Sequence, residues 1–122
     1  MNDLDLTGRR VLVVEDEYLL ARFLRELLEI WGATIFGPAA TIEEALALLA
    51  QADRVDFAML DVNLRGATAF AVADALRARG IPFIFTTGYT PSTIPERYRD
   101  AAVLRKPFSN AELARALLAL AS

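Results

Sequence analysis

The chain has 122 residues, a length that suits one domain, and 55% of them are hydrophobic, enough for a core on both faces of a sheet. Its net charge is −3, and the 13 basic and 16 acidic residues are spread along the sequence, which argues against a nucleic-acid-binding surface. It contains no cysteine and no histidine, which excludes disulfides, thiolate or histidine metal sites and a Ser/His/Asp triad.

Short apolar runs recur along the chain and are too short for helices. Most are rich in β-branched residues and leucine, and several end directly on a polar side chain. Nearly continuous apolar runs of this length are typical of strands buried on both faces. In chain order, the predicted strands span residues 10–14, 33–36, 55–61, 82–87 and 102–105.

The segments between these runs have apolar residues at intervals of three and four, which predicts surface helices. Two capping boxes, Thr41 with Glu44 and Ser109 with Glu112, mark the starts of the second and the last helix. Prolines within residues 88–100 restrict that segment to one short helical piece, so we expect an irregular connection. In chain order, the predicted helices span residues 18–31, 41–51, 67–79, a short piece at 95–99, and 109–122.

Strands and helices therefore alternate along the whole chain. This alternation predicts an α/β fold, a doubly wound parallel sheet with helices on both faces. We expect one domain over residues 1–122 with no output domain. No uncharged apolar segment approaches the ~20 residues of a membrane-spanning helix, and the acidic first residues do not form a signal peptide. We therefore expect a cytoplasmic protein with no membrane association.

Polar residues stand at the carboxyl ends of four predicted strands, where ligands bind in such sheets. Each alone has a structural explanation: acids favour helix starts, Asp61 and Thr87 suit turns, and a lysine is usually solvated. Lys106, however, is the only lysine among 13 basic residues. Four polar strand ends on one edge favour a functional site. The candidate residues are Glu15 and Asp16, Asp61, Thr87 and Lys106.

Three neighbouring carboxylates repel one another, which calls for a cation. Ligands that are all oxygen select a hard ion, and Mg²⁺ with a phosphate oxygen is the best match. Asp61 is then a candidate nucleophile toward phosphorus, because a carboxylate needs no general base. Lys106 and the Thr87 hydroxyl would each bind a phosphoryl oxygen.

With these residues in this order, the chain resembles the receiver domains of two-component response regulators over nearly its whole length. The resemblance implies a five-stranded (βα)5 flavodoxin-like fold with strand order 2-1-3-4-5. It also implies Asp61 as the phosphoacceptor, Thr87 and Lys106 as its catalytic partners, and a cis bond between Lys106 and Pro107. The implied Mg²⁺ ligands are Glu15, Asp16, Asp61 and the backbone carbonyl of Asn63.

The resemblance further implies a phosphohistidine donor, on a sensor histidine kinase or a histidine phosphotransfer protein. Residues 82–89 resemble a receiver subgroup named for a Phe-Ala-Thr-Gly-x-Tyr sequence, which is often paired with kinases of the HWE type. Val103 occupies the position where the family usually has a switch aromatic. We therefore expect Thr87, Gly88 and Tyr89 to form the switch. Two further departures from the family pattern are Arg65, where many members have proline, and Thr86, where the subgroup has alanine.

We expect a phosphoacceptor that switches a protein-interaction surface, and not an enzyme that turns over an external substrate. Its outputs would be an unknown downstream protein or a second copy of the chain, with Arg97, Tyr98 and Arg99 as solvated surface residues near that face. The alternative is a phosphorylation-independent interaction module with the same fold. A flavodoxin-like electron carrier is disfavoured because Glu15 and Asp16 replace the phosphate-binding loop that it would need.

Overall fold

The computed structural model describes residues 4–88 and 94–121, and its centre is a five-stranded parallel sheet. The strands lie in the order β2-β1-β3-β6-β7, which is the predicted order 2-1-3-4-5 of the five main strands. The doubly wound α/β fold is therefore confirmed. The strands are β1 (Arg10–Val14), β2 (Thr34–Ala39), β3 (Phe57–Asp61), β6 (Phe83–Thr87) and β7 (Ala102–Arg105).

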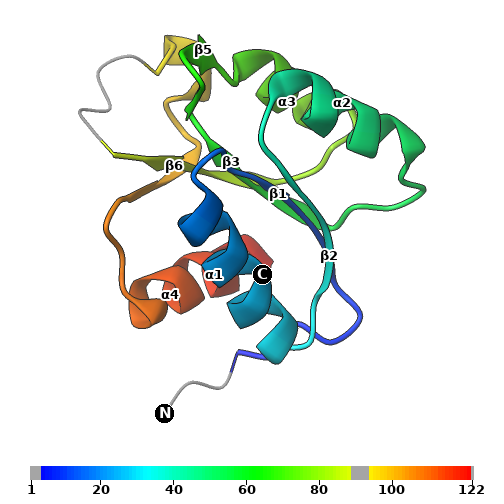
Figure 1. Cartoon of the computed structure of the whole chain (residues 1–122), viewed down its shortest axis with the longest axis vertical. Helices are drawn as coiled ribbons and strands as arrows, with labels where there is room; N and C mark the ends of the chain where they lie inside the picture. Colours follow the sequence, from blue (N-terminus) through cyan, green and yellow to red (C-terminus); the bar gives the residue numbers. More distant parts are fainter. Residues whose placement is uncertain (1–3, 89–93, 122) are drawn as a thin grey trace.

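Two layers of helices cover the sheet (Figure 1). Helices α1 (Tyr18–Ile30) and α4 (Asn110–Ala121) lie on one face, and α2 (Ile42–Gln51) and α3 (Phe70–Ala78) lie on the other. Alternate side chains of each strand enter the two resulting cores. In β3, for example, Phe57 and Met59 pack toward α1 and α4, while Ala58 and Leu60 pack toward α2 and α3.

The predicted N-cap residues cap both helices, and the second helix start has the complete capping box. The Glu44 amide donates to Thr41 Oγ1 at 3.1 Å, and the Glu112 amide donates to Ser109 Oγ at 3.0 Å. The Ser109 amide in turn donates to Glu112 Oε1 at 2.8 Å, which completes a reciprocal pair. None of the helices within the described residues has the length and apolar composition needed to cross a bilayer.

The predicted third helix is too long at its start, because a small antiparallel hairpin precedes it. Strands β4 (Asn63–Leu64) and β5 (Ala67–Thr68) form this hairpin, and α3 begins only at Phe70. Its two turn residues, Arg65 and Gly66, have φ values of 52° and 84°. Two successive positive φ values match the tight turn that joins antiparallel strands with their natural twist.

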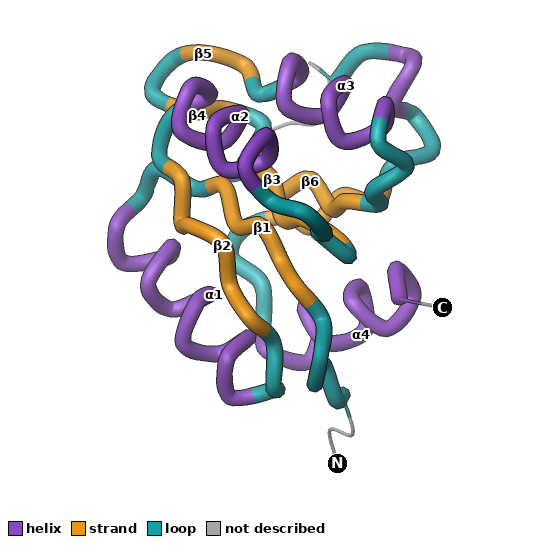
Figure 2. Tube along the Cα trace, turned by 90° about the vertical axis from the view of Figure 1, so that its right-hand side faces the viewer, coloured by secondary structure: helices purple, strands orange, loops and turns teal. Residues whose placement is uncertain are grey.

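The second strand is longer than predicted. It continues through Gly37 and Pro38 to Ala39, and the peptide bond between Gly37 and Pro38 is cis. A register shift between Leu12 and Val14 of β1 accommodates this irregular piece, after which Val14 pairs with Ala39. The strand tolerates its glycine and proline because it lies at the edge of the sheet (Figure 2). One side of an edge strand pairs with no neighbouring strand, so a missing N–H there breaks no ladder hydrogen bond.

The fourth connection carries no α-helix within the described residues. It contains the 3-10 helix η2 (Glu96–Tyr98), within the short piece that the prolines predict. Tyr98 is not a solvated surface residue as expected: it is 1% exposed and stacks on the Phe70 ring. The guanidinium groups of Arg77 and Arg97 lie 4.7 and 4.8 Å from its ring centre.

Candidate functional site

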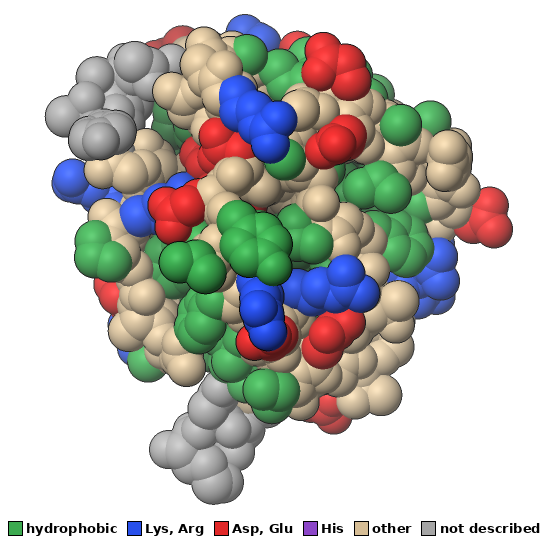
Figure 3. Space-filling view, viewed as in Figure 1, with side chains coloured by type: hydrophobic (Ala, Val, Ile, Leu, Met, Phe, Trp, Pro, Cys, Tyr) green, Lys and Arg blue, Asp and Glu red, His purple; other side chains and the backbone are tan. Residues whose placement is uncertain are grey.

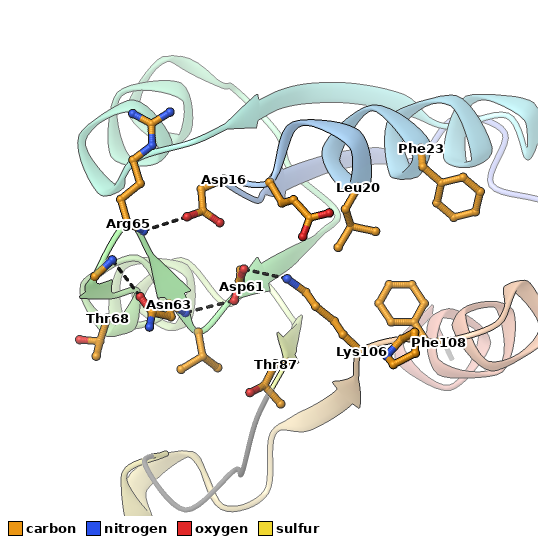
Figure 4. Close-up of a pocket in the computed structure, with 15 residues that line it drawn as sticks. Asp16, Leu20, Phe23, Asp61, Asn63, Arg65, Thr68, Thr87, Lys106 and Phe108 are labelled. Carbon is orange, nitrogen blue, oxygen red and sulfur yellow. Dashed lines mark hydrogen bonds and ion pairs between the residues drawn. The ribbon is translucent and has the colours of Figure 1, made fainter.

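The four polar strand ends meet at one edge of the sheet. Asp61 and Thr87 are the last residues of β3 and β6, Glu15 and Asp16 directly follow β1, and Lys106 directly follows β7. The strands are parallel and adjacent, so all these side chains reach the same edge. A pocket of about 910 Å³ opens there, and Asp16, Asp61, Thr87 and Lys106 line it (Figure 4).

Lys106 joins the acids of two strands. Its Nζ lies 2.9 Å from Asp61 Oδ2, to which it donates a hydrogen bond, and 2.9 Å from Glu15 Oε1. The Lys106 amide also donates to the Thr87 carbonyl at 2.8 Å, which fixes the start of this loop against β6. A compact ammonium group suits this position because it can face two carboxylates at once.

Burial governs the electrostatics of the site. Glu15 is only 2% exposed, and this burial raises its pKa from 4.5 to about 7. The hydrogen bond from Lys106 opposes the rise in the Glu15 pKa, and the charge of Asp61 adds to it. Burial lowers the pKa of Lys106, but its bonds to Asp61 and Glu15 outweigh that effect and the net shift is upward. Lys106 therefore stays charged beside a carboxyl group that is readily protonated.

The three carboxylates fit a hard divalent cation. One oxygen from each of Glu15, Asp16 and Asp61 can lie within 4.8 Å of the others. Glu15 Oε1 is buried and lies 2.9 Å from the positively charged Lys106 Nζ. A buried carboxylate oxygen of this kind favours a positive ligand, and an all-oxygen set favours Mg²⁺. These three residues would hold the ion, and the expected role of the Asn63 carbonyl stays a prediction.

The β4–β5 hairpin supplies backbone contacts that the sequence did not reveal. The Asn63 amide donates to Asp61 Oδ1 at 3.1 Å, and the Arg65 amide donates to Asp16 Oδ2 at 2.9 Å. Both bonds are drawn in Figure 4. The Arg65-Gly66 dipeptide was the available signal for this hairpin, but the alanines after it suggested an early helix start.

One wall of the pocket is apolar, which was also not anticipated. Leu20 and Phe23 of α1 face Phe108 from the loop before α4 (Figure 4), and Pro107 also lines the pocket. Phe23 follows the apolar spacing of its helix that predicts a buried face, yet it is 43% exposed. Its spacing alone could not separate a core residue from the rim of a pocket.

The expected cis peptide bond between Lys106 and Pro107 is confirmed.

The expected switch residues are only partly described. Thr87 is 8% exposed and lines the pocket beside Gly88. Tyr89 lies outside the described residues. Val103, at the position of the family's usual aromatic, is 39% exposed on β7.

Comparison with known proteins identifies the class. A family model of the response regulator receiver domain matches residues 11–118, and the chain belongs to this family. It is thus a receiver domain of the kind found in two-component response regulators.

Three relatives place the chain within the family. Its sequence is 44% identical to that of SdrG from Pseudomonas melonis Fr1, over 93% of this chain and 96% of that one. The structure matches the beryllofluoride-activated conformation of SdrG with a TM-score of 0.79. The chain is 34% identical to the transcriptional regulatory protein PdtaR of Mycobacterium tuberculosis, over 89% of this chain and 55% of that protein. The phyllosphere-induced regulator PhyR of Methylorubrum extorquens is 32% identical, over 84% of this chain and 40% of that protein. The chain thus spans about half the length of these two curated relatives or less.

Proposed function

We propose that the chain is the phosphoacceptor receiver of a two-component phosphorelay, with Asp61 accepting the phosphoryl group. The observation that carries this proposal is the arrangement around Asp61. Asp61 is 6% exposed and lines the pocket, its carboxylate accepts a hydrogen bond from the Lys106 ammonium group, and it belongs to a cluster of three acids that fits Mg²⁺. Burying several charged side chains together costs much free energy of desolvation. A surface that only binds a partner does not need such a cluster, so the cluster favours a chemical role.

Phosphoryl transfer would proceed by attack of an Asp61 oxygen on the phosphorus of a phosphohistidine. The new O–P bond forms as the N–P bond breaks, and the leaving imidazole takes up a proton. When bound, Mg²⁺ supplies positive charge for the transferring oxygens. Lys106 would move from the acid pair toward one phosphoryl oxygen, and the Thr87 hydroxyl would bind another. One phosphoryl group per chain makes this a phosphoacceptor and not a turnover enzyme.

A sensor histidine kinase or a histidine phosphotransfer protein would be the donor, and α1 offers it a docking surface. Three large apolar side chains of this helix, Tyr18, Leu19 and Ile30, are more than 70% exposed. Figure 3 shows apolar side chains gathered over α1 among basic and acidic ones. Exposed apolar side chains ringed by charge are typical of protein-binding surfaces.

The finer assignments are part of the same proposal. The sequence of β6 and the following turn supports the Phe-Ala-Thr-Gly-x-Tyr subgroup, with an HWE-type kinase as donor. The activated conformation recorded for SdrG involves beryllofluoride, a mimic of a phosphoryl group, which supports a phosphorylation-dependent switch here. The output would be an unidentified downstream protein or a second copy of the chain, in the cytoplasm.

The test is incubation with Mg²⁺ and acetyl phosphate, followed by intact mass measurement. Wild type is expected to gain one phosphoryl group, and Asp61→Asn none. Asp53→Asn is the matched control, because Asp53 is an exposed aspartate outside the pocket lining and is expected to behave as wild type. A folded wild type that binds Mg²⁺ but gains no mass, from acetyl phosphate or from a phosphorylated histidine kinase, would instead be a phosphorylation-independent module.

A further inference from the structure

One backbone amide ties the hairpin after β3 to an acid that follows β1. The Arg65 N–H donates to Asp16 Oδ2 at 2.9 Å, across 49 positions of sequence. A carboxylate has about four lone-pair sites on its two oxygens, so this bond leaves Asp16 able to bind a cation. What the bond fixes is the direction in which the remaining lone pairs point.

The hairpin is built to hold that amide in place. Arg65 has a φ of 52°, an uncommon conformation for a residue with a side chain, and Gly66 follows at 84°. The Gly66 amide donates to Asn63 Oδ1 at 3.1 Å, a hydrogen bond within the turn that stabilises its conformation. Leu64 is 2% exposed and anchors the hairpin in the core.

The same hairpin also orients the second acid of the site. The Asn63 amide donates to Asp61 Oδ1 at 3.1 Å. Asp16 and Asp61 therefore each accept a hydrogen bond from a backbone amide of the same hairpin. These two acids come from the ends of adjacent strands, β1 and β3. Groups that fix a metal ligand from behind commonly control metal affinity by 10- to 100-fold.

We propose that the Arg65 backbone amide is a positioning group for Asp16, and that the hairpin sets the Mg²⁺ affinity of the site. This proposal rests on the metal-dependent function proposed above. The bond needs an N–H and a positive φ at position 65, and not the arginine side chain, whose guanidinium points away from the acids in Figure 4. Glycine at this position meets both needs, whereas proline has no N–H and cannot adopt that φ.

The first test uses protein without metal and detects the bond itself. Amide hydrogen exchange at Arg65, followed by NMR, is expected to be at least about tenfold slower in wild type than in Asp16→Ala. Equal exchange in the two proteins would overturn the proposal. This measurement does not depend on phosphorylation or on metal binding.

The second test measures Mg²⁺ affinity by calorimetry, with the fold checked by circular dichroism. Arg65→Gly keeps the amide and is expected to bind within about twofold of wild type, while Arg65→Pro is expected to bind about tenfold or more weakly. Gly66→Val, a β-branched residue forced to positive φ, displaces the turn without removing an amide and replaces Arg65→Pro if that variant fails to fold.

The outcomes separate the two proposals. A wild type that binds no Mg²⁺ would contradict the proposed function, while the exchange measurement would still decide whether the amide holds Asp16. A wild type that binds Mg²⁺, with Arg65→Pro and Gly66→Val binding it equally well, would overturn the positioning role alone.

Discussion

Raising the pH from 5 to 8 without divalent cations is expected to destabilise the protein, because it ionises a buried acid. Glu15 has a pKa raised from 4.5 to about 7, mainly by burial. Between these two values the folded chain binds a proton that the unfolded chain has released. The free energy of unfolding must therefore fall as the pH rises through this window, and the loss is complete above about pH 7.

The size of the effect follows from the displacement of the pKa. One unit is worth 1.36 kcal/mol, so the whole displacement corresponds to about 3 kcal/mol, of which roughly 2 kcal/mol falls between pH 5 and pH 8. For a domain of this size that is a fall of about 8 °C in Tm. The chain has no histidine, so few other groups titrate in this range.

The assay is urea unfolding at several pH values in the presence of a chelator. Glu15→Gln is the control, because glutamine has a similar shape and cannot titrate, so its stability should be nearly flat across the window. Adding Mg²⁺ to wild type should flatten the profile too, because the cation displaces the proton and stabilises the folded state at pH 8. Parallel pH profiles for wild type and Glu15→Gln in chelator would refute the reasoning.

Three further perturbations have defined outcomes. Lys106→Met removes the ammonium group that faces two buried acids. It is expected to lower the free energy of unfolding by about 3 kcal/mol at pH 8 and by less at pH 5, measured by urea unfolding. An equal loss at both pH values would contradict this. Tyr98→Phe removes the hydroxyl that donates to Asp74 and should cost about 1 kcal/mol, with no loss indicating that water replaces the bond. Gly32→Ala would place its Cβ 2.7 Å from Thr7 Oγ1, in the segment before β1, and should cost about 3 kcal/mol by thermal unfolding. Gly80→Ala, also at positive φ but in open space, should cost only about 1 kcal/mol, and a similar cost for both would refute the steric explanation.

The strands and the position of the site were predictable because they depend on local patterns. Apolar runs that stop on Asp61 or before Lys106 fix both the strand and its polar end, and parallel pairing then brings the ends together. Capping boxes are equally local, so Thr41 and Ser109 mark helix starts correctly.

The errors come from residues whose role depends on distant contacts. The alanines after Gly66 have high helix propensity, yet Ala67 pairs with Leu64 in a hairpin because Leu64 is drawn into the core. Tyr98 lies between two arginines in sequence and was expected at the surface, but the aromatic side chains of α3 and β6 provide a site for its ring. Neither partner is close to it in sequence.

The irregular second strand has a consequence for self-association. An edge strand exposes a row of backbone donors and acceptors that can recruit a strand from another molecule. Pro38 interrupts that row in β2, because its nitrogen carries no hydrogen, and the bulge beside it bends the backbone out of line. The sheet is thus protected on this side against growth into β-aggregates.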